Sequence, residues 1–166
     1  IILVNDAAPN FASIEFCSLK EEMEKTSGTF HLRDYYSKET YCRIFIPRVF
    51  PQYDKVLYLD CDITVTGDIS ELYNTDLGDN LVAASVEEVM GSYDVFGTYV
   101  EKALGVKREK YLSAGILLIN AELYRKQDIE IKFIELMNNF KFRVTQDEDY
   151  LNVLCKDKVK YLSLGW

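Results

Sequence analysis

Two aspartates in the segment KVLYLDCDITV, residues 55–65, give this sequence its clearest chemical potential. Asp60 and Asp62 are separated by one residue and follow the apolar run Val56–Leu59. Two carboxylates that leave a strand at this spacing can turn toward one hard cation. Mg²⁺ and Mn²⁺ bind oxygen ligands, commonly one or two protein carboxylates with water and substrate phosphate. The pair therefore predicts a metal site that neutralises a diphosphate and stabilises it as a leaving group.

Two other interpretations of the same residues stay open. Aspartate often caps the turn at a strand end, which would give Asp60 and Asp62 a purely structural role. Asp60, Asp62 and Thr64 also match the DxDxT opening of haloacid-dehalogenase-like phosphatases, in which Asp60 would be the nucleophile and Asp62 an acid or base. That motif normally opens its domain, whereas here at least one expected strand and one expected helix precede it.

The composition is that of one globular domain over residues 1–166, with 48% hydrophobic and 28% charged residues and no internal repeat or linker. A formal charge of −8 argues against a nucleic-acid partner, because phosphate contacts need a basic surface. The cysteines are scattered and the one histidine, His31, is interpreted as structural, so neither a zinc site nor a disulfide framework is expected. We expect a reducing, cytoplasmic location, with peripheral association at the inner membrane face through regions outside this chain left open.

Apolar runs alternate with amphipathic segments along the chain. Strands are expected at residues 1–5, 13–19, 55–59, 81–86, 116–120 and 159–164, and helices at residues 37–45, 95–104, 129–142 and 147–156. Pro47 is expected to limit the first helix, and KVLYL is expected to be a central strand buried on both faces. The alternation predicts an α/β domain with a mostly parallel sheet, whose ligands bind beyond the carboxyl ends of the strands. Asp60 and Asp62 fall at such an end.

A series of motifs extends from Tyr41 to Trp166: YCRIFIP, PQYDKVLYLDCDITVTGDISELYNTDLGDN, LVAAS, YLSAGILLIN and TQDEDYLN. In order and approximate spacing this series resembles glycosyltransferase family 8, which includes bacterial lipopolysaccharide galactosyl- and glucosyltransferases and glycogenin. The resemblance implies a GT-A fold, a UDP-glucose or UDP-galactose donor and a divalent metal, Mn²⁺ or Mg²⁺. It also implies hexose transfer to a carbohydrate or glycoprotein acceptor with retention of anomeric configuration.

By this resemblance Asp60 and Asp62 would hold the metal, and Cys61 would lie near the ribose or base of the donor. Arg43 stands at the arginine position of the family's Tyr-x-Arg motif and would contact the donor. A guanidinium inside an apolar helix also needs an anionic partner on physical grounds. A structural ion pair with a nearby aspartate is the alternative role for Arg43.

The segment Ser113, Ala114 and Gly115 replaces the family's Asn-Ala-Gly or Asn-Ser-Gly, whose small residues let the backbone approach the donor sugar. Gly115 suits a close approach on physical grounds as well. Ser113 in place of asparagine leaves open which sugar hydroxyl is bound. Glu87 stands where relatives often carry an acidic residue facing the active site, and a solvated loop charge is the equal alternative.

The acidic cluster at residues 146–149 matches the family's Asp-Gln-Asp segment. The resemblance directs Asp147 toward the donor sugar hydroxyls and Glu148 toward the reacting face, as a nucleophile or as electrostatic support. Double displacement and front-face attack both stay open, and we favour front-face attack. The structural alternative is that carboxylates in a first helical turn cap free N–H groups and stabilise the helix dipole.

Two parts of the family pattern are not found. They are the first strand with its acidic, base-binding end, and the late His-x-x-Gly…Lys-Pro-Trp segment whose histidine completes the metal site. We therefore expect an incomplete GT-A catalytic domain from a longer polypeptide, with the third metal ligand unidentified. A non-catalytic module that binds a sugar nucleotide is the alternative from another functional class.

Overall fold

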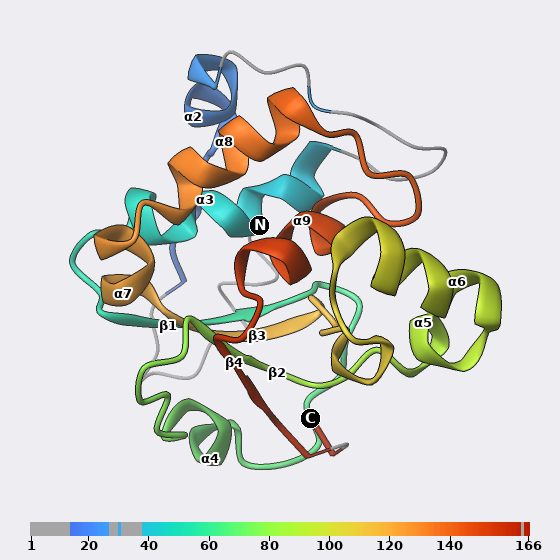
Figure 1. The fold of residues 1–166 in the computed structure, drawn as a ribbon. Helices are drawn as coiled ribbons and strands as arrows, with labels where there is room; N and C mark the ends of the chain where they lie inside the picture. The colour runs from blue at the N-terminus through green and yellow to red at the C-terminus, as the bar shows by residue number, and fades with distance from the viewer. Residues whose placement is uncertain (1–13, 27–29, 31–37, 164) are drawn as a thin grey trace.

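The computed structural model describes residues 14–26, 30, 38–163 and 165–166 (Figure 1). Within these ranges the strands form one sheet in the order β1-β3-β2-β4. The strands are β1 (Lys55–Leu59), β2 (Val82–Ala84), β3 (Ile116–Asn120) and β4 (Val159–Tyr161). The expected strand at residues 1–5 and His31 lie outside the described residues.

Helices fill most of the chain between the strands. They are α2 (Lys20–Lys25), η1 (Lys38–Tyr41), α3 (Cys42–Val49), α4 (Ile69–Tyr73), α5 (Glu88–Ser92), α6 (Asp94–Tyr99), η2 (Val100–Leu104), η3 (Arg108–Lys110), α7 (Ala121–Lys126), α8 (Ile129–Asn139) and α9 (Asp147–Leu154). The helices expected at 95–104, 129–142 and 147–156 are confirmed as α6 with η2, α8 and α9. Pro47 lies inside α3, which ends at Val49, so the proline shortens this helix less than predicted.

The α/β fold class is confirmed, with one strand running against the others. β3 is antiparallel to both β1 and β2, whereas β2 and β4 are parallel. β1, β2 and β4 therefore share one direction, but two of the three pairings in the described sheet are antiparallel. Sequence periodicity does not reveal this because a buried apolar run looks the same in either direction.

Two strand predictions are wrong. All five residues of β1 are only half-buried, and β1 lies at one end of the described sheet, so KVLYL is not the strand buried on both faces. The inner positions belong to β3, where Leu117, Leu118 and Ile119 are almost fully buried, and to β2, where all three residues are buried. Residues 14–19 of the expected strand at 13–19 form no strand, and α2 begins directly after them at Lys20.

The sheet separates two apolar cores. Leu117 and Ile119 belong to the main core with residues of α3, α8 and α9, whereas Leu118 packs on the other face. This division follows from the alternation of side chains along a strand. Figure 1 shows α3, α8 and α9 gathered over one face and α4 on the opposite side. Phe133 of α8 packs against Phe45 and Tyr150 with ring centroids 6.1 Å and 5.5 Å away, which fixes α3 and α9 over the sheet.

All four cysteines, Cys17, Cys42, Cys61 and Cys155, carry free thiols. Among the helices of the described ranges, none combines the length and the apolar character that crossing a bilayer requires.

Candidate functional site

Four separate segments meet at the carboxyl end of β1. Asp60 directly follows β1, and its backbone N–H donates to the Gly115 carbonyl at 2.9 Å. This bond joins the turn after β1 to the segment that enters β3. The third segment is α3, which carries Arg43, and the fourth is the first turn of α9, which carries Asp147 and Glu148.

Arg43 connects all four segments. Its side chain is only 7% exposed, and its Nη2 lies 3.3 Å from Asp60 Oδ1. Its Nε lies 2.9 Å from Asp147 Oδ2, and its Nη1 donates to the Ala114 carbonyl. A planar guanidinium can serve several acceptors at once, which a lysine ammonium in the same place does with less geometric control. The expected anionic partner of Arg43 is therefore present as a pair of aspartates, which is the structural alternative stated for this residue.

Tyr58 supports the same cluster from β1. Its hydroxyl donates to Asp60 Oδ1 at 2.5 Å, and its ring lies under the Arg43 guanidinium at 4.7 Å from Arg43 Cζ to the centroid. Burial and the bonded Asp60 carboxylate raise the Tyr58 pKa far above its usual range. Sequence reasoning missed this residue. The signal for it was its position two residues before Asp60, which puts both side chains on one side of the strand.

Asp147 is a buried carboxylate, and one of its oxygens accepts no hydrogen bond from the described part of the chain. It is 4% exposed, and burial raises its pKa to about 6 against the opposing charge of Arg43. Although Arg43 Nε lies close to Oδ2, its N–H points to the Thr40 carbonyl at 3.0 Å. Within the described residues no hydrogen-bond donor is aligned with Asp147 Oδ2. A buried acceptor without a donor is suited to a ligand hydroxyl.

Glu148 lies beside Asp147 and is bonded to the segment before β3. The Ala114 N–H donates to Glu148 Oε1 at 2.8 Å. Burial raises the Glu148 pKa to about 8; the bond from Ala114 opposes the shift, and the nearby charges of Asp147 and Glu87 add to it. In the absence of a ligand this carboxyl therefore keeps its proton near neutral pH, and its second oxygen can donate a hydrogen bond.

The turn after β1 contains Cys61 and Asp62, both of which are exposed. Asp60 Oδ1 is used by Tyr58 and Arg43, whereas Oδ2 lies 3.3 Å from where a Cβ on Gly115 would be. The described residues contain no cluster of three or more His, Cys, Asp or Glu side chains that could hold a metal ion. Asp60 and Asp62 remain as two carboxylate ligands, which fits a Mg²⁺ or Mn²⁺ site whose other ligands are water and phosphate.

Glu87 and Ser113 lie at the rim of this cluster. The Glu87 carboxylate caps α5 by accepting from the Val89 N–H at 2.9 Å, and it is close enough to Glu148 to raise the pKa of that carboxyl. The cap is a role that the sequence did not suggest, and the predicted position facing the active site stays a prediction. The Ser113 N–H donates to the Ser85 carbonyl at 2.8 Å, which ties the segment before β3 to the end of β2.

Asn152, which sequence reasoning also missed, fastens α9 to this segment. Its amide accepts from the Leu112 N–H at 2.7 Å and donates to the Leu112 and Glu148 carbonyls, each at 3.0 Å. Asp149 is fully buried and accepts from the hydroxyls of Tyr99 and Tyr111 at 2.7 Å and 2.8 Å. Asp149 therefore has a structural role in the acidic cluster, because its carboxylate is bonded to two tyrosines.

Comparison with known proteins identifies relatives of this chain and of its fold. The family model for glycosyl transferase family 8 matches residues 4–166. The glycosyltransferase GlyE of Streptococcus pneumoniae is 37% identical over 124 residues, which is 74% of this chain and 26% of GlyE. The lipopolysaccharide 1,3-galactosyltransferase of Salmonella typhimurium is 34% identical over 128 residues, 74% of this chain and 37% of that protein. The chain thus spans well under half the length of either relative.

Among solved structures, the galactosyltransferase LgtC in complex with donor and acceptor sugar analogues is similar to this chain. The TM-score is 0.67 at 31% identity, over 80% of this chain and 47% of LgtC. This likeness confirms the GT-A fold that the sequence resemblance implied. The phosphatase alternative gains no support from these comparisons.

Proposed function

Because the chain belongs to glycosyltransferase family 8, we propose that it transfers a hexose from a UDP-sugar to an acceptor with retention of configuration. The observation that carries this proposal is the buried Arg43, which contacts Asp60, Asp147 and the Ala114 carbonyl together. Residues of four separate segments thus form one polar centre at the end of β1. The relatives named as glycosyltransferases support the same reaction class.

The donor sugar would lie against the segment before β3 and the first turn of α9. Asp147 Oδ2, a buried acceptor without an aligned donor in the described chain, would receive a sugar hydroxyl. Gly115 already meets Asp60 at close range, so any side chain there would crowd the diphosphate end of the donor. Cys61 and Ser113 would border the nucleotide and the sugar. Arg43 would orient Asp60 and Asp147 and balance their charge.

In the transfer, the acceptor oxygen forms a bond to the anomeric carbon while the bond from that carbon to the diphosphate oxygen breaks. The electron pair leaves with UDP, and the acceptor hydroxyl proton passes to the departing phosphate oxygen. We favour front-face attack because Glu148 keeps its proton near neutral pH, and a neutral carboxyl is a poor nucleophile. Glu148 would instead support the oxocarbenium-like centre by its dipole.

A divalent metal, Mn²⁺ or Mg²⁺, would be held by Asp60 Oδ2 and the exposed Asp62, with the diphosphate and water as further ligands. When bound, the ion neutralises the diphosphate and stabilises its departure. Two carboxylates alone make a weak site, so we propose a third protein ligand outside this chain.

We propose a bacterial surface glycan, such as lipopolysaccharide, or a glycoprotein as the acceptor. The galactosyltransferase of Salmonella typhimurium that resembles this chain is named for lipopolysaccharide. The proposed location is cytoplasmic, where UDP-sugars are made, with association at the inner face of the membrane through regions outside this chain.

The test is UDP release from a panel of sugar nucleotides with and without Mn²⁺. We expect release from UDP-glucose or UDP-galactose that requires the metal and is lost in Asp62→Ala. Asp79→Ala, which removes another exposed aspartate, is the matched control and should keep full activity. Activity that survives a chelator and Asp62→Ala would contradict the proposal. UDP binding by calorimetry without release would favour the non-catalytic alternative.

A further inference from the structure

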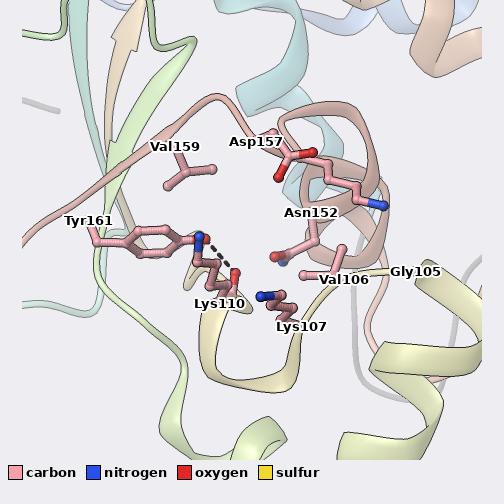
Figure 2. Close-up of a pocket in the computed structure, with 9 residues that line it drawn as sticks. Gly105, Val106, Lys107, Lys110, Asn152, Asp157, Val159 and Tyr161 are labelled. Atoms are coloured by element: carbon pink, nitrogen blue, oxygen red, sulfur yellow. Dashed lines mark hydrogen bonds between the residues drawn. The ribbon is translucent and has the colours of Figure 1, made fainter.

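A second pocket lies at the β4 edge of the sheet, at the other end of the strand order from Asp60. It has a volume of 360 Å³, and Figure 2 shows it between the loop at residues 105–110, the end of α9 and β4. None of the residues that line it belongs to the centre around Arg43. A cavity of this size falls in the range of small-ligand sites.

The charge of this pocket is opposite to that of the chain. Lys107, Lys110 and Lys156 line it together with one carboxylate, Asp157, which leaves a local charge of 3 − 1 = +2 in a chain of net charge −8. The lysines come from two segments, KREK at residues 107–110 and KDKVK at residues 156–160, that are far apart in sequence. The fold therefore brings the two lysine-rich segments to one place.

These three ammonium groups have no carboxylate within 4.0 Å in the described part of the chain. Arg108, in the same turn, differs because its guanidinium pairs with Glu101 at 2.9 Å and Asp94 at 3.2 Å. The neighbouring cation is thus neutralised by the protein, whereas the pocket lysines are left available. Unpaired like charges in one cavity repel each other, and an anionic ligand would relieve that repulsion.

The Lys156 ammonium lies next to the loop on the other side of the pocket. Gly105 ends η2 with a φ of +66°, and Asp157 adopts a φ of +62° in the turn before β4. A Cβ on Gly105 would lie 3.6 Å from Lys156 Nζ, so the ammonium lies close above this glycine.

The uncharged polar side chains in the pocket, Tyr161 and Asn152, are already hydrogen-bonded, and Asp157 is its one carboxylate. The Tyr161 hydroxyl donates to the Lys110 carbonyl at 2.6 Å, and the buried Asn152 amide is bonded to Leu112 and to the Glu148 carbonyl. The free donors are therefore the three ammonium groups. A ligand for this pocket must supply the acceptors and negative charge.

We propose that this pocket binds a phosphate group, carried by a small phosphorylated molecule or by a lipid headgroup. Lysine binds phosphate as a point charge without a fixed geometry, which suits three ammonium groups from two segments. A carboxylate carries half the charge of a phosphate dianion and would bind less tightly. This site is distinct from the diphosphate site proposed near Asp60, so it stands whether or not the chain transfers a sugar.

The experiment is a titration of the isotopically labelled chain with inorganic phosphate, followed by NMR at low salt. We expect shifts confined to residues 105–110 and 152–161, with affinity that falls as salt rises. Lys156→Met should weaken binding about twofold to fivefold. The triple variant, in which Lys107, Lys110 and Lys156 are all replaced by methionine, should weaken binding roughly tenfold to a hundredfold. Lys132→Met, an exposed lysine on α8, is the control and should bind as the parent chain does.

Replacing the same three lysines with arginine keeps the charge and should retain binding. Phosphate binding that the triple methionine variant leaves unchanged, or that acetate matches, would overturn the proposal. Vesicles with an anionic phosphomonoester lipid distinguish the sources, because binding to them that exceeds binding to free phosphate assigns the headgroup. Binding to neither probe would overturn the proposal.

Discussion

The replacement of Arg43 by methionine tests the central ion-pair cluster most directly. Methionine fills a similar volume but removes the charge that pairs with Asp147 and Asp60 and the donors to the Ala114 and Thr40 carbonyls. Asp147 is 4% exposed and would be left as a buried carboxylate without its cation. Removing one partner of a buried pair costs about 3 to 5 kcal/mol, and the partly exposed Asp60 adds little because solvent screens it.

The pH dependence separates the charge from the packing. Burial already raises the Asp147 pKa to about 6, and loss of Arg43 would raise it further. A carboxyl with a raised folded-state pKa contributes its full stability below the unfolded pKa and loses it as pH rises through the folded pKa. At about pH 5 the variant can protonate Asp147, so the cost should fall to about 1 to 3 kcal/mol, the value of the lost hydrogen bonds.

The assay is urea unfolding of the parent chain and Arg43→Met at pH 5 and pH 8, followed by circular dichroism. Asp147→Asn and the double variant complete a double-mutant cycle, in which a coupling of about 1 to 3 kcal/mol is expected at pH 8. Arg48→Met is the matched control, since that arginine is 47% exposed and its loss should cost under about 1 kcal/mol. A cost for Arg43→Met that is the same at both pH values, or a coupling near zero, would refute the reasoning.

Three further predictions address the neighbouring residues. The Glu148 pKa is raised to about 8, so the free energy of unfolding of the parent chain should fall by about 2 to 4 kcal/mol relative to that of Glu148→Gln as pH rises from 5 to 8. Urea unfolding measures this difference, and an equal pH dependence of the two proteins would contradict it. Asn152→Ala leaves two buried Leu112 backbone groups unpaired and should cost about 3 kcal/mol, whereas Asn139→Ala on the exposed face of α8 should cost under about 1 kcal/mol. Asp62→Ala should leave stability within about 0.5 kcal/mol because Asp62 is exposed, yet raise the Mn²⁺ concentration for half-maximal UDP release more than about tenfold. An unchanged Mn²⁺ requirement would remove Asp62 from the proposed metal site.

The fold could be predicted where periodicity is strong. The helical face of Ile129, Phe133 and Met137 correctly indicated α8, because spacings of three and four have one structural explanation. The sequence could not show that the buried strands are β2 and β3, and that β1 is an end strand of the described sheet. Burial of an apolar run depends on its neighbours in the sheet, which lie far away along the chain.

The candidate site residues were predicted through motif resemblance, whereas the contacts between them were not predicted. A lone arginine in an apolar helix indicated an anionic partner, yet the sequence offered no way to choose among the 27 acidic residues. The structure selects Asp60 and Asp147, which are 17 and 104 residues away from Arg43 in the chain. The supporting roles of Tyr58 and Asn152 are contacts of common residue types, and such contacts become visible only when the elements are packed.

The charges of the site bear on how a diphosphate could bind there. By formal charge, Asp60, Asp62, Asp147 and Glu87 each count as −1 and Arg43 as +1, whereas Glu148 keeps its proton near neutral pH because its pKa is raised to about 8. Four negative charges against one positive charge leave about −3, which would repel a diphosphate. Arg43 cannot both balance the two aspartates and neutralise the ligand. A divalent ion between Asp62 and the diphosphate would supply the missing charge. The raised Glu148 pKa comes mainly from burial, with a smaller contribution from the charges of Asp147 and Glu87. Glu148→Gln should therefore leave the metal requirement intact, whereas an Asp62→Asn variant should weaken metal binding without restoring diphosphate binding in the presence of a chelator.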